Sequence, residues 1–428
     1  MEPQDTDQLL LTTSETPTSE PQRTRPPRFA LWRNQDYMLL WSGQIVSNVG
    51  AQASTLAFPL LILTLTGSPA LAGLAGTLRA LPYLLFSLPA GALIDRWDRK
   101  RVMIICDVGR TLAMASIPLA FVLGQLTIIQ IFVATTIEGA LFVFFNIAEA
   151  ACLPRVVPKS LLPEATAQNM ATDGITTLLG PPIGGLLYQI GNVIPFLADA
   201  VSYACSVLSL FFIKTNFQEE RIAVQRSLWI EIHEGLRWLW HNPLIRFMAI
   251  LTGGNNLISA GLTLVIIVLA QQMHASSFSI GLIFAIGGIG AIGGALIGPL
   301  LQKRLSFGVA IISMMWIMAL SMPLYSIAPN IVIIGIVMAV SFVGGSVYNV
   351  VQFSYRSAII PDELQGRVNS VFRLIAFGGQ PLGYALIGLL IQDLGVTPTI
   401  LIASAVLIAL AVATTLNTHI RHAQPLAS

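Results

Sequence analysis

The residues best suited to chemistry in this sequence are ionisable side chains that lie inside long apolar runs. They are Arg79, Asp107, Arg110, Glu138, Glu149, Asp173, Asp199 and Arg373. Charged groups are costly in bilayer hydrocarbon, so in membrane proteins they pair, line aqueous paths or relay protons. Asp107 and Arg110 are three positions apart and can pair on one helix face. Either a structural pair or a part in proton transfer fits them.

Glu138 is the most unusual of these residues, because the run around it, ATTIEGALFVFF, contains no basic side chain. A buried carboxyl group without a partner could exchange a proton, or could bind a cationic group of a substrate. Asp173 is a second candidate for proton exchange, although it lies near the end of its run and could instead serve as a cap or a latch. We therefore predict that Glu138, Asp107, Arg110 and Asp173 take part in proton coupling.

The composition indicates a membrane protein. Only 10% of the 428 residues are charged, 54% are hydrophobic, and the mean hydropathy is +0.74. A soluble domain carries charge on about a quarter of its residues, so most of this surface must face something other than water. The net charge of +2 is too small to suggest nucleic acid as a partner. The sequence shows no metal-type cluster and no Ser/His/Asp grouping, so we expect no bound metal, no cofactor and no enzymatic activity. It also shows no phosphate-binding Gly-Lys-Ser/Thr loop, so we expect that ATP is not the energy source.

Twelve apolar runs, each about long enough to span a bilayer as a helix, follow a polar tail of residues 1–28. They cover residues 37–64, 70–94, 101–123, 126–150, 166–189, 194–214, 244–270, 279–301, 305–327, 331–355, 367–391 and 397–418. The chain should therefore be an all-α membrane protein with twelve transmembrane helices. A short tail, residues 419–428, follows the last run.

The basic residues fix an orientation. If the N-terminus is cytoplasmic and the runs alternate, all but three of the 23 basic residues fall in cytoplasmic segments or at the cytoplasmic ends of runs. The three exceptions, Arg79, Arg110 and Arg373, lie inside runs, and the external loops have none. Positive residues favour the cytoplasmic side. We expect both termini in the cytoplasm and the protein in the plasma membrane.

An internal repeat divides the chain into two halves. LWRN at residues 31–34 opens the first run and LWHN at residues 239–242 opens the seventh, while Pro158 and Pro361 precede the fifth and eleventh. We predict an N-terminal half of residues 29–214, a linker of residues 215–243 and a C-terminal half of residues 244–418. Parallel repeats of this kind place substrate between the halves. Within residues 216–242, Leu228, Ile232, Leu236 and Leu239 share one face, which indicates an amphipathic interfacial helix, either a connector or a regulatory element.

A charged segment between the second and third runs carries a family resemblance. It reads GALIDRWDRKR, residues 91–101. Gly91, Asp95, Arg96, Arg99 and Lys100 match the loop signature of the major facilitator superfamily, and the form DRWDRKR resembles the branch of macrolide-efflux permeases and the enterobactin exporter. The resemblance implies that Asp95 acts as a conformational latch between the halves. Alternatively, the basic residues only fix topology and bind anionic lipid.

GPPIGG in the fifth run is the second matching motif. Gly180, Pro181, Gly184 and Gly185 resemble the Gly-Pro motif that the superfamily associates with proton-driven exporters. Gly290, Gly294 and Gly298 recur every four residues in the eighth run, so the fifth and eighth helices should slide against each other through small residues. Ordinary close packing without any role in antiport is the alternative.

The resemblance also implies where substrate binds. Its cavity-lining helices carry Asn48, Asn255, Asn256 and Tyr348 in this sequence, although hydrogen bonds between helices would explain each of them as well. The function implied is secondary active transport, with proton-coupled export of a hydrophobic or amphipathic small molecule such as a drug, macrolide or siderophore. We expect small-molecule substrate, protons and membrane lipid as partners of a monomer. A nutrient uptake symporter or a non-transporting membrane sensor or scaffold is the alternative.

Overall fold

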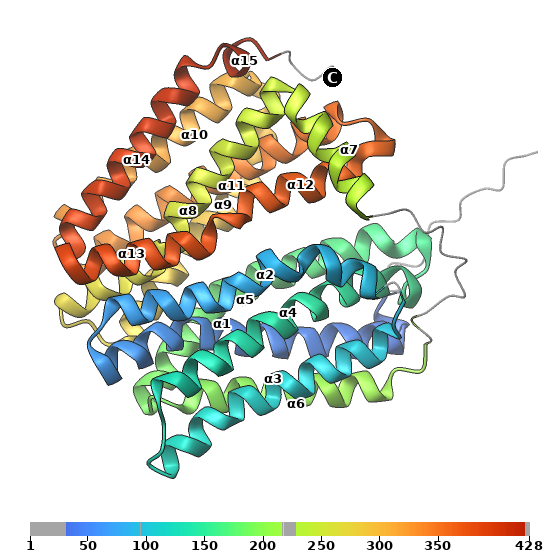
Figure 1. The fold of residues 1–428 in the computed structure, drawn as a ribbon, viewed down its shortest axis with the longest axis vertical. Helices are drawn as coiled ribbons and strands as arrows, with labels where there is room; N and C mark the ends of the chain where they lie inside the picture. Colours follow the sequence, from blue (N-terminus) through green and yellow to red (C-terminus); the bar gives the residue numbers. More distant parts are fainter. Residues whose placement is uncertain (1–30, 95, 216, 218–227, 424–428) are drawn as a thin grey trace, which may run out of the picture.

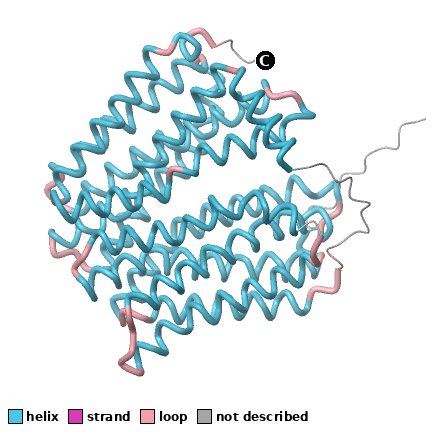
Figure 2. The backbone as a smooth tube through the Cα atoms, viewed as in Figure 1, coloured by secondary structure: helices cyan, strands magenta, loops and turns pink. Residues whose placement is uncertain are grey.

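The computed structural model describes residues 31–94, 96–215, 217 and 228–423. Nearly all of these residues are helical, and the described part of the chain contains no strand (Figure 2). The predicted tail of residues 1–28 and most of residues 216–227 lie outside the described residues. The expected all-α fold class is confirmed.

Two bundles of helices lie side by side in Figure 1. The N-terminal half contains α1 (Gln35–Thr66), α2 (Pro69–Ile94), α3 (Arg99–Val122), α4 (Ile128–Val156), α5 (Leu162–Ile190) and α6 (Ile194–Phe212). The C-terminal half contains α8 (Pro243–Gln272), α9 (Ser277–Arg304), α10 (Phe307–Ser321), α11 (Ile331–Ile359), α12 (Gln365–Gly378), α13 (Gln380–Leu394) and α14 (Val396–Leu416). Two short helices, α7 (Leu228–His241) and α15 (Thr418–Arg421), lie at one end of the bundle, which we call the linker end.

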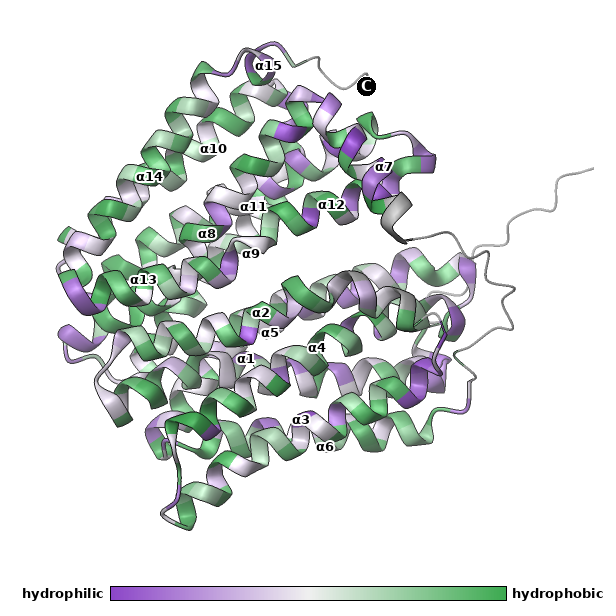
Figure 3. Cartoon of the chain, in the orientation of Figure 1, coloured by the Kyte–Doolittle hydropathy of each residue, from purple (hydrophilic) through white to green (hydrophobic). Residues whose placement is uncertain are grey.

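The predicted spans correspond to these helices. Eleven segments of the described chain are long and apolar enough to cross a membrane, and α5, with 29 residues, is long enough although it carries several polar side chains. Large apolar side chains on the outside of the bundle, such as Val122 at 80% and Ile129 at 74% exposure, face outward, as lipid contact requires. In Figure 3 hydrophilic residues gather most clearly around α7 and the linker end.

Two predicted spans are not single helices. The run 367–391 is divided at Gly379 into α12 and α13, because Pro381 in the first turn of α13 has no backbone N–H to continue the ladder. The run 305–327 is α10 followed by a 3₁₀ segment, Met322–Ile327. Both breaks keep the chain helical across the bilayer, so the number of crossings is unchanged.

The helices begin where short polar side chains can cap them. Asn34, Asp98 and Ser306 each accept a hydrogen bond from a backbone N–H in the first turn of α1, α3 and α10. At the other end of α1, Gly67 adopts φ +65°, a left-handed conformation that ends the helix without the strain a side chain would add. These boundaries are determined by residues close to them in the sequence, which is why the predicted spans agree with them.

The internal repeat is visible in the backbone. Pro158 and Pro361 are each followed by a 3₁₀ turn, Lys159–Leu161 and Asp362–Leu364, and then by α5 or α12. The two prolines have nearly the same conformation, with φ −54° and ψ 143° against φ −55° and ψ 141°. The same local sequence thus starts the fifth helix of each half.

The linker helix α7 packs on the C-terminal half. Glu234 and Arg367 form an ion pair between α7 and α12, and a Cβ on Gly235 would lie 2.6 Å from the carbonyl oxygen of Arg367. Leu239 of the predicted apolar face is fully buried, whereas Leu236 is 40% exposed. An amphipathic helix is therefore present in the predicted linker, and it is docked to α12.

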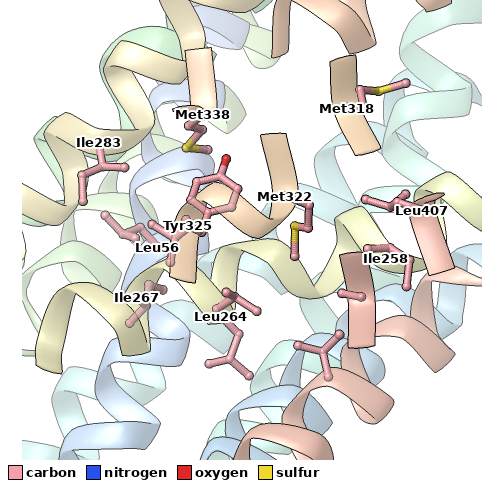
Figure 4. Close-up of a cluster of buried hydrophobic side chains, with 14 of the residues drawn as sticks. Leu56, Ile258, Leu264, Ile267, Ile283, Met318, Met322, Tyr325, Met338 and Leu407 are labelled. Carbon is pink, nitrogen blue, oxygen red and sulfur yellow. The ribbon is translucent and has the colours of Figure 1, made fainter. Parts of the chain in front are cut away.

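The apolar core of the C-terminal half reaches the N-terminal half at the end opposite the linker, which we call the far end. Figure 4 shows Leu56 of α1 among buried side chains of the C-terminal half, including Leu264 and Ile267 of α8 and Met338 of α11. The two halves are thus packed against each other there.

Candidate functional site

A cavity of about 880 Å³ lies between the two halves. Most of its wall comes from α1, α2, α4 and α5, and the C-terminal half contributes Thr263, Leu264, Arg373, Phe377, Gln380 and Tyr384. Aromatic side chains, amides and threonines line it, with a few charged groups. A wall of this kind suits an organic molecule with both apolar and polar surface.

The cavity is closed at the far end by contacts between α2 and α13. Ser68 donates a hydrogen bond to Oε1 of Gln392 at 2.9 Å, and Thr77 donates one to the carbonyl oxygen of Pro381 at 2.9 Å. A Cβ on Gly388 would lie 2.8 Å from the carbonyl oxygen of Pro69, so the helix backbones are nearly in contact. Glycine is what permits this approach.

Helices α5 and α9 form the second contact between the halves. A Cβ on Gly281 of α9 would lie 2.8 Å from the Cα of Pro182, and one on Gly288 would lie 3.2 Å from the side chain of Leu178. Gly185 of α5 faces the backbone of Ser277. These contacts lie in the far-end portions of both helices.

Towards the linker end the cavity wall continues along the N-terminal halves of α1 and α5. Tyr37, Trp41 and Asp173 belong to this part of the wall. A contact between the halves in this direction joins Tyr83 of α2 to α12. Arg373 donates a hydrogen bond to the Tyr83 hydroxyl at 2.7 Å, and the centroids of the Tyr83 and Phe377 rings lie 6.4 Å apart. The described structure therefore has a central cavity that is sealed at the far end and extends towards the linker end.

Four charged side chains form a buried cluster beside this cavity. Arg79 contacts Glu138 through Nε and Oε2 at 2.7 Å, and Arg110 contacts the other oxygen of Glu138 at 3.3 Å. Arg110 also contacts Asp107 at 3.2 Å. The two guanidinium groups carry two positive charges and the two carboxylates carry two negative charges. Buried charged groups are tolerated when they are paired in this way.

Only one member of this charge cluster has substantial exposure. The side chain of Arg79 is 28% exposed, whereas Glu138 is 1%, Arg110 is 3% and Asp107 is 0% exposed. Tyr203 of α6 completes the packing: it accepts a hydrogen bond from Arg110 at 2.6 Å, and its ring lies 3.9 Å from the Arg110 guanidinium carbon. The cluster thus ties together α2, α3, α4 and α6.

The expectation that Glu138 lacks a partner is wrong. Its own helix carries no base, but α2 and α3 each turn an arginine towards it. The pairing of Asp107 with Arg110 is present as expected, and Asp107 Oδ2 has no hydrogen-bond partner among the described residues. Sequence reasoning missed Tyr203 and the role of Arg79. The position of Arg79 inside an apolar run was the signal that could have found it.

The other predicted site residues are divided between the cavity and the helix packing. Asn48 and Asp173 line the cavity, and so does Glu149. Asn256 instead donates to the carbonyl oxygen of Ala376 at 2.8 Å, and Tyr348, 2% exposed, is hydrogen-bonded to Thr252 at 2.8 Å. Asn255 is not part of the cavity wall in this conformation. The structure therefore does not bring the four predicted substrate contacts together.

The charged loop between α2 and α3 is only partly described. Asp95 lies outside the described residues. Arg99 donates to the carbonyl oxygen of Ala151 at 3.1 Å, and Lys100 donates to that of Ile213 at 2.6 Å, so both contact their own half. Arg96 is exposed, and a Cβ on Gly91 would meet nothing within 4 Å. The predicted latch role of this loop remains a prediction.

The glycine motifs face partners that differ in part from those predicted. Gly180 and Gly184 pack on α1, at Gln52 and Ala53, while Gly185 faces α9. Gly290 and Gly294 face α11 at Ala339 and Val343, and Gly298 packs on Val350 of the same helix. The prediction that these three glycines form the face for α5 is therefore wrong. The small-residue contact between α5 and α9 exists, but Gly281 and Gly288 provide it, because they point from the opposite side of α9.

Comparison with known proteins agrees with this architecture. Residues 27–427 match the family described as transmembrane secretion effector. The chain belongs to this family of major facilitator superfamily transporters. Its relatives include the multidrug efflux pump Tap of Mycolicibacterium fortuitum, 25% identical over 88% of this chain and 94% of that protein. Macrolide efflux protein A of Streptococcus pyogenes is 25% identical over 91% of this chain and 97% of that protein.

Among solved structures, a bacterial homologue of the iron transporter ferroportin has the same fold. Its inward-facing structure gives a TM-score of 0.74 at 16% identity, over 90% of this chain and 98% of that one. Its outward-facing structure gives a TM-score of 0.60 over 89% of this chain. The resemblance to the macrolide-efflux branch and the major facilitator fold predicted from the sequence are both confirmed. The transporter is a multi-pass membrane protein that acts on a small-molecule substrate.

Proposed function

We propose that this transporter exports a hydrophobic or amphipathic small molecule in exchange for protons. The central cavity of about 880 Å³ between the halves is the observation that carries this proposal. Its aromatic and amide lining suits a drug-like or macrolide-like molecule better than a sugar or a small anion, which needs dense hydrogen bonding or charge. The relation to multidrug and macrolide efflux proteins supports the same substrate class.

The linker end is the cytoplasmic side in this proposal, with both termini in the cytoplasm and the protein in the plasma membrane. The distribution of basic residues supports it, because they gather in the segments at this end. The cavity then opens to the cytoplasm, which is the compartment from which an exporter takes its substrate. The N-terminal half of residues 29–214 and the C-terminal half of residues 244–418 would rock about the cavity, joined by the linker of residues 215–243.

Proton exchange is assigned to the charge cluster and to Asp173. Glu138 is held by two arginines, and Tyr203 lies 3.4 Å from it as a further donor, whereas Asp107 has one arginine and an oxygen without a partner. Asp107 Oδ2 is thus the oxygen of the cluster that accepts the proton. Adding that proton leaves one positive charge in excess, which favours opening of the cluster towards the cavity. Asp173, exposed in the cavity wall, passes protons to the cytoplasmic side.

Asp95 acts as the latch in this scheme, together with Gly91, Arg96, Arg99 and Lys100. The described residues of this loop lie at the linker end, where the halves must meet when the cavity opens to the outside. A carboxylate there can accept hydrogen bonds from the facing half only in that outward-facing state. In the described structure, Arg99 and Lys100 each donate a hydrogen bond to a carbonyl group of their own half.

Everted membrane vesicles test the proposed function, because their cytoplasmic face is outside. With an acidic lumen, labelled erythromycin should accumulate inside, and a protonophore should abolish the accumulation. Asp107→Asn should lose this dependence on the gradient while still binding the drug. Accumulation that survives the protonophore would contradict proton coupling. Gradient-driven accumulation in right-side-out vesicles instead would identify an uptake symporter.

A further inference from the structure

A second cavity, of about 490 Å³, lies at the linker end of the C-terminal half, away from the central cavity. It is formed where the start of α8 meets α15 and the end of α11. Its wall consists of Asn242, Pro243, Leu244, Tyr355, Thr418, His419, His422 and Ala423. The wall contains hydrogen-bond donors and two imidazoles, and it contains no carboxylate among these residues. We call it the α8–α15 cavity.

The N-terminus of α8 opens into this cavity without a cap. The side chain of Asn242, at the N-cap position, accepts no hydrogen bond from the first turn, unlike that of Asn34 in α1. Pro243 has no N–H, so the next backbone amides of this 30-residue helix are the free donors. The helix dipole adds positive potential at the same place, which favours an anion.

Tyr355 is an independent indication that the cavity suits a polar ligand. Its side chain is 4% exposed, and its ring is stacked on Phe307 with the centroids 3.9 Å apart, so its position is fixed. Tyr355 lines the cavity, and its hydroxyl has no hydrogen-bond partner among the described residues. The hydroxyl is not enclosed by protein, so it can donate a hydrogen bond to a ligand bound in the cavity.

The two histidines are held in place by the short helix α15. Ile420 is fully buried, and its carbonyl group lies against Gly308 of α10, where a side chain could not fit. Asn417 caps α15 by accepting a hydrogen bond from the Ile420 N–H at 3.1 Å. His419 and His422 are thereby held beside the start of α8, where their ring nitrogens line the cavity.

The internal repeat shows what occupies the equivalent place in the other half. Asp36 follows Asn34 by two positions, and its carboxylate accepts hydrogen bonds from the backbone N–H groups of Lys214, at 3.2 Å, and Thr215, at 2.9 Å. That carboxylate joins the start of α1 to the segment after α6. In the C-terminal half the residue two positions after Asn242 is Leu244, and the segment after α14 is α15. Among the described residues no carboxylate takes that place in the C-terminal half, and a cavity is present.

We propose that the α8–α15 cavity binds a phosphate group, as a phospholipid headgroup or as free phosphate, in the place that Asp36 fills in the N-terminal half. The α8 amides and the Tyr355 hydroxyl would donate to the phosphate oxygens, and the histidines would balance its charge. A phosphate with three or four acceptor oxygens suits this set of converging donors. Such a ligand would tie α15 to α8 as Asp36 ties the segment after α6 to α1.

Leu244→Asp is the decisive variant, because it supplies the missing carboxylate from within the chain, and Leu244→Asn is its uncharged control. Two ligands are tested on purified protein. Retained dioleoylphosphatidylglycerol is counted by native mass spectrometry, and inorganic phosphate is titrated calorimetrically. We expect Leu244→Asp to weaken binding at least tenfold and Leu244→Asn to retain it. His419→Ala with His422→Ala should also weaken binding, whereas His233→Ala, an exposed histidine on α7, should not.

The two arms distinguish the sources of the phosphate. If the protein binds the lipid and not inorganic phosphate, the cavity is a headgroup site. If it binds inorganic phosphate, with or without the lipid, the cavity is a site for the phosphate group itself. The proposal is overturned if the wild-type protein binds neither ligand, or if Leu244→Asp and Leu244→Asn bind both equally. Size-exclusion profiles and melting temperatures of every variant show that loss of binding is not loss of folding.

Discussion

Replacing Glu138 with glutamine should destabilise the N-terminal half strongly. In the charge cluster two guanidinium groups face two carboxylates. The substitution leaves Arg110 with Asp107 and leaves Arg79 without an ion-pair partner among the described residues. Removing one partner of a buried ion pair costs about 3–5 kcal/mol. Because Arg79 is 28% exposed and glutamine keeps one acceptor oxygen, we expect the lower end, about 3 kcal/mol.

The assay is thermal unfolding in detergent, followed by tryptophan fluorescence. For a domain the size of one six-helix half, about 3 kcal/mol corresponds to a melting temperature lower by roughly 6–12 °C. Removing a positive charge as well should restore the balance. Glu138→Gln combined with Arg79→Gln should therefore recover at least half of the lost stability, which is the coupling that a double-mutant cycle measures.

Asp199 provides a matched control. It is as buried as Glu138, at 0% exposure, but its contacts are the hydroxyls of Ser54 at 2.6 Å and Ser202 at 3.3 Å, with no ion pair among the described residues. Asp199→Asn should cost about 1 kcal/mol, since an amide still hydrogen-bonds to hydroxyls. Equal losses in Glu138→Gln and Asp199→Asn, or no recovery in the double variant, would refute the balanced cluster.

Three further substitutions, two of them paired with a comparison variant, test the contacts between helices and the cavity wall. Gly185→Val puts a branched side chain against the backbone of α9. It should prevent closure at the far end and reduce drug efflux at least tenfold. Gly293 has open space around it, so Gly293→Ala should leave efflux unchanged in the same assay. Asn48→Ala should raise the KM for erythromycin several-fold without changing the melting temperature. Asn256→Ala should instead lower the free energy of unfolding by about 1 kcal/mol and leave the KM unchanged. Efflux kinetics and thermal unfolding measure the two effects. Tyr83→Phe removes the hydrogen bond to α12 and should loosen the linker end, seen as faster labelling by a thiol reagent of a cysteine introduced at Ala150 in the cavity wall.

The sequence predicted the helices well because their ends are determined locally. Caps such as Asn34 and Ser306, and the repeated Pro158 and Pro361, lie within a few residues of the boundaries that they set. Even α5, which carries several polar residues, was predicted as the apolar run 166–189. The ion pair of Asp107 and Arg110 was likewise predictable, since both lie on one helix.

The side-chain contacts between different helices were not predictable, because they depend on how each helix is rotated about its axis. Nothing near Glu138 in the sequence indicates that Arg79, 59 positions earlier, reaches it. For the same reason Gly290 was assigned to α5 although it faces α11, and Tyr348 was assigned to the cavity although it contacts Thr252. Helical spacing defines which residues share a face, and only packing shows what that face meets.

The central claim is that the halves must separate at the far end for substrate to leave. A cysteine pair at Ser68 and Gln392, whose side chains are hydrogen-bonded across the halves, tests it directly. We predict that joining the pair with a short, cleavable thiol crosslinker stops erythromycin efflux, and that reduction of the crosslink restores efflux to the level of the untreated variant. Unchanged efflux with the crosslink in place would contradict alternating access through this cavity.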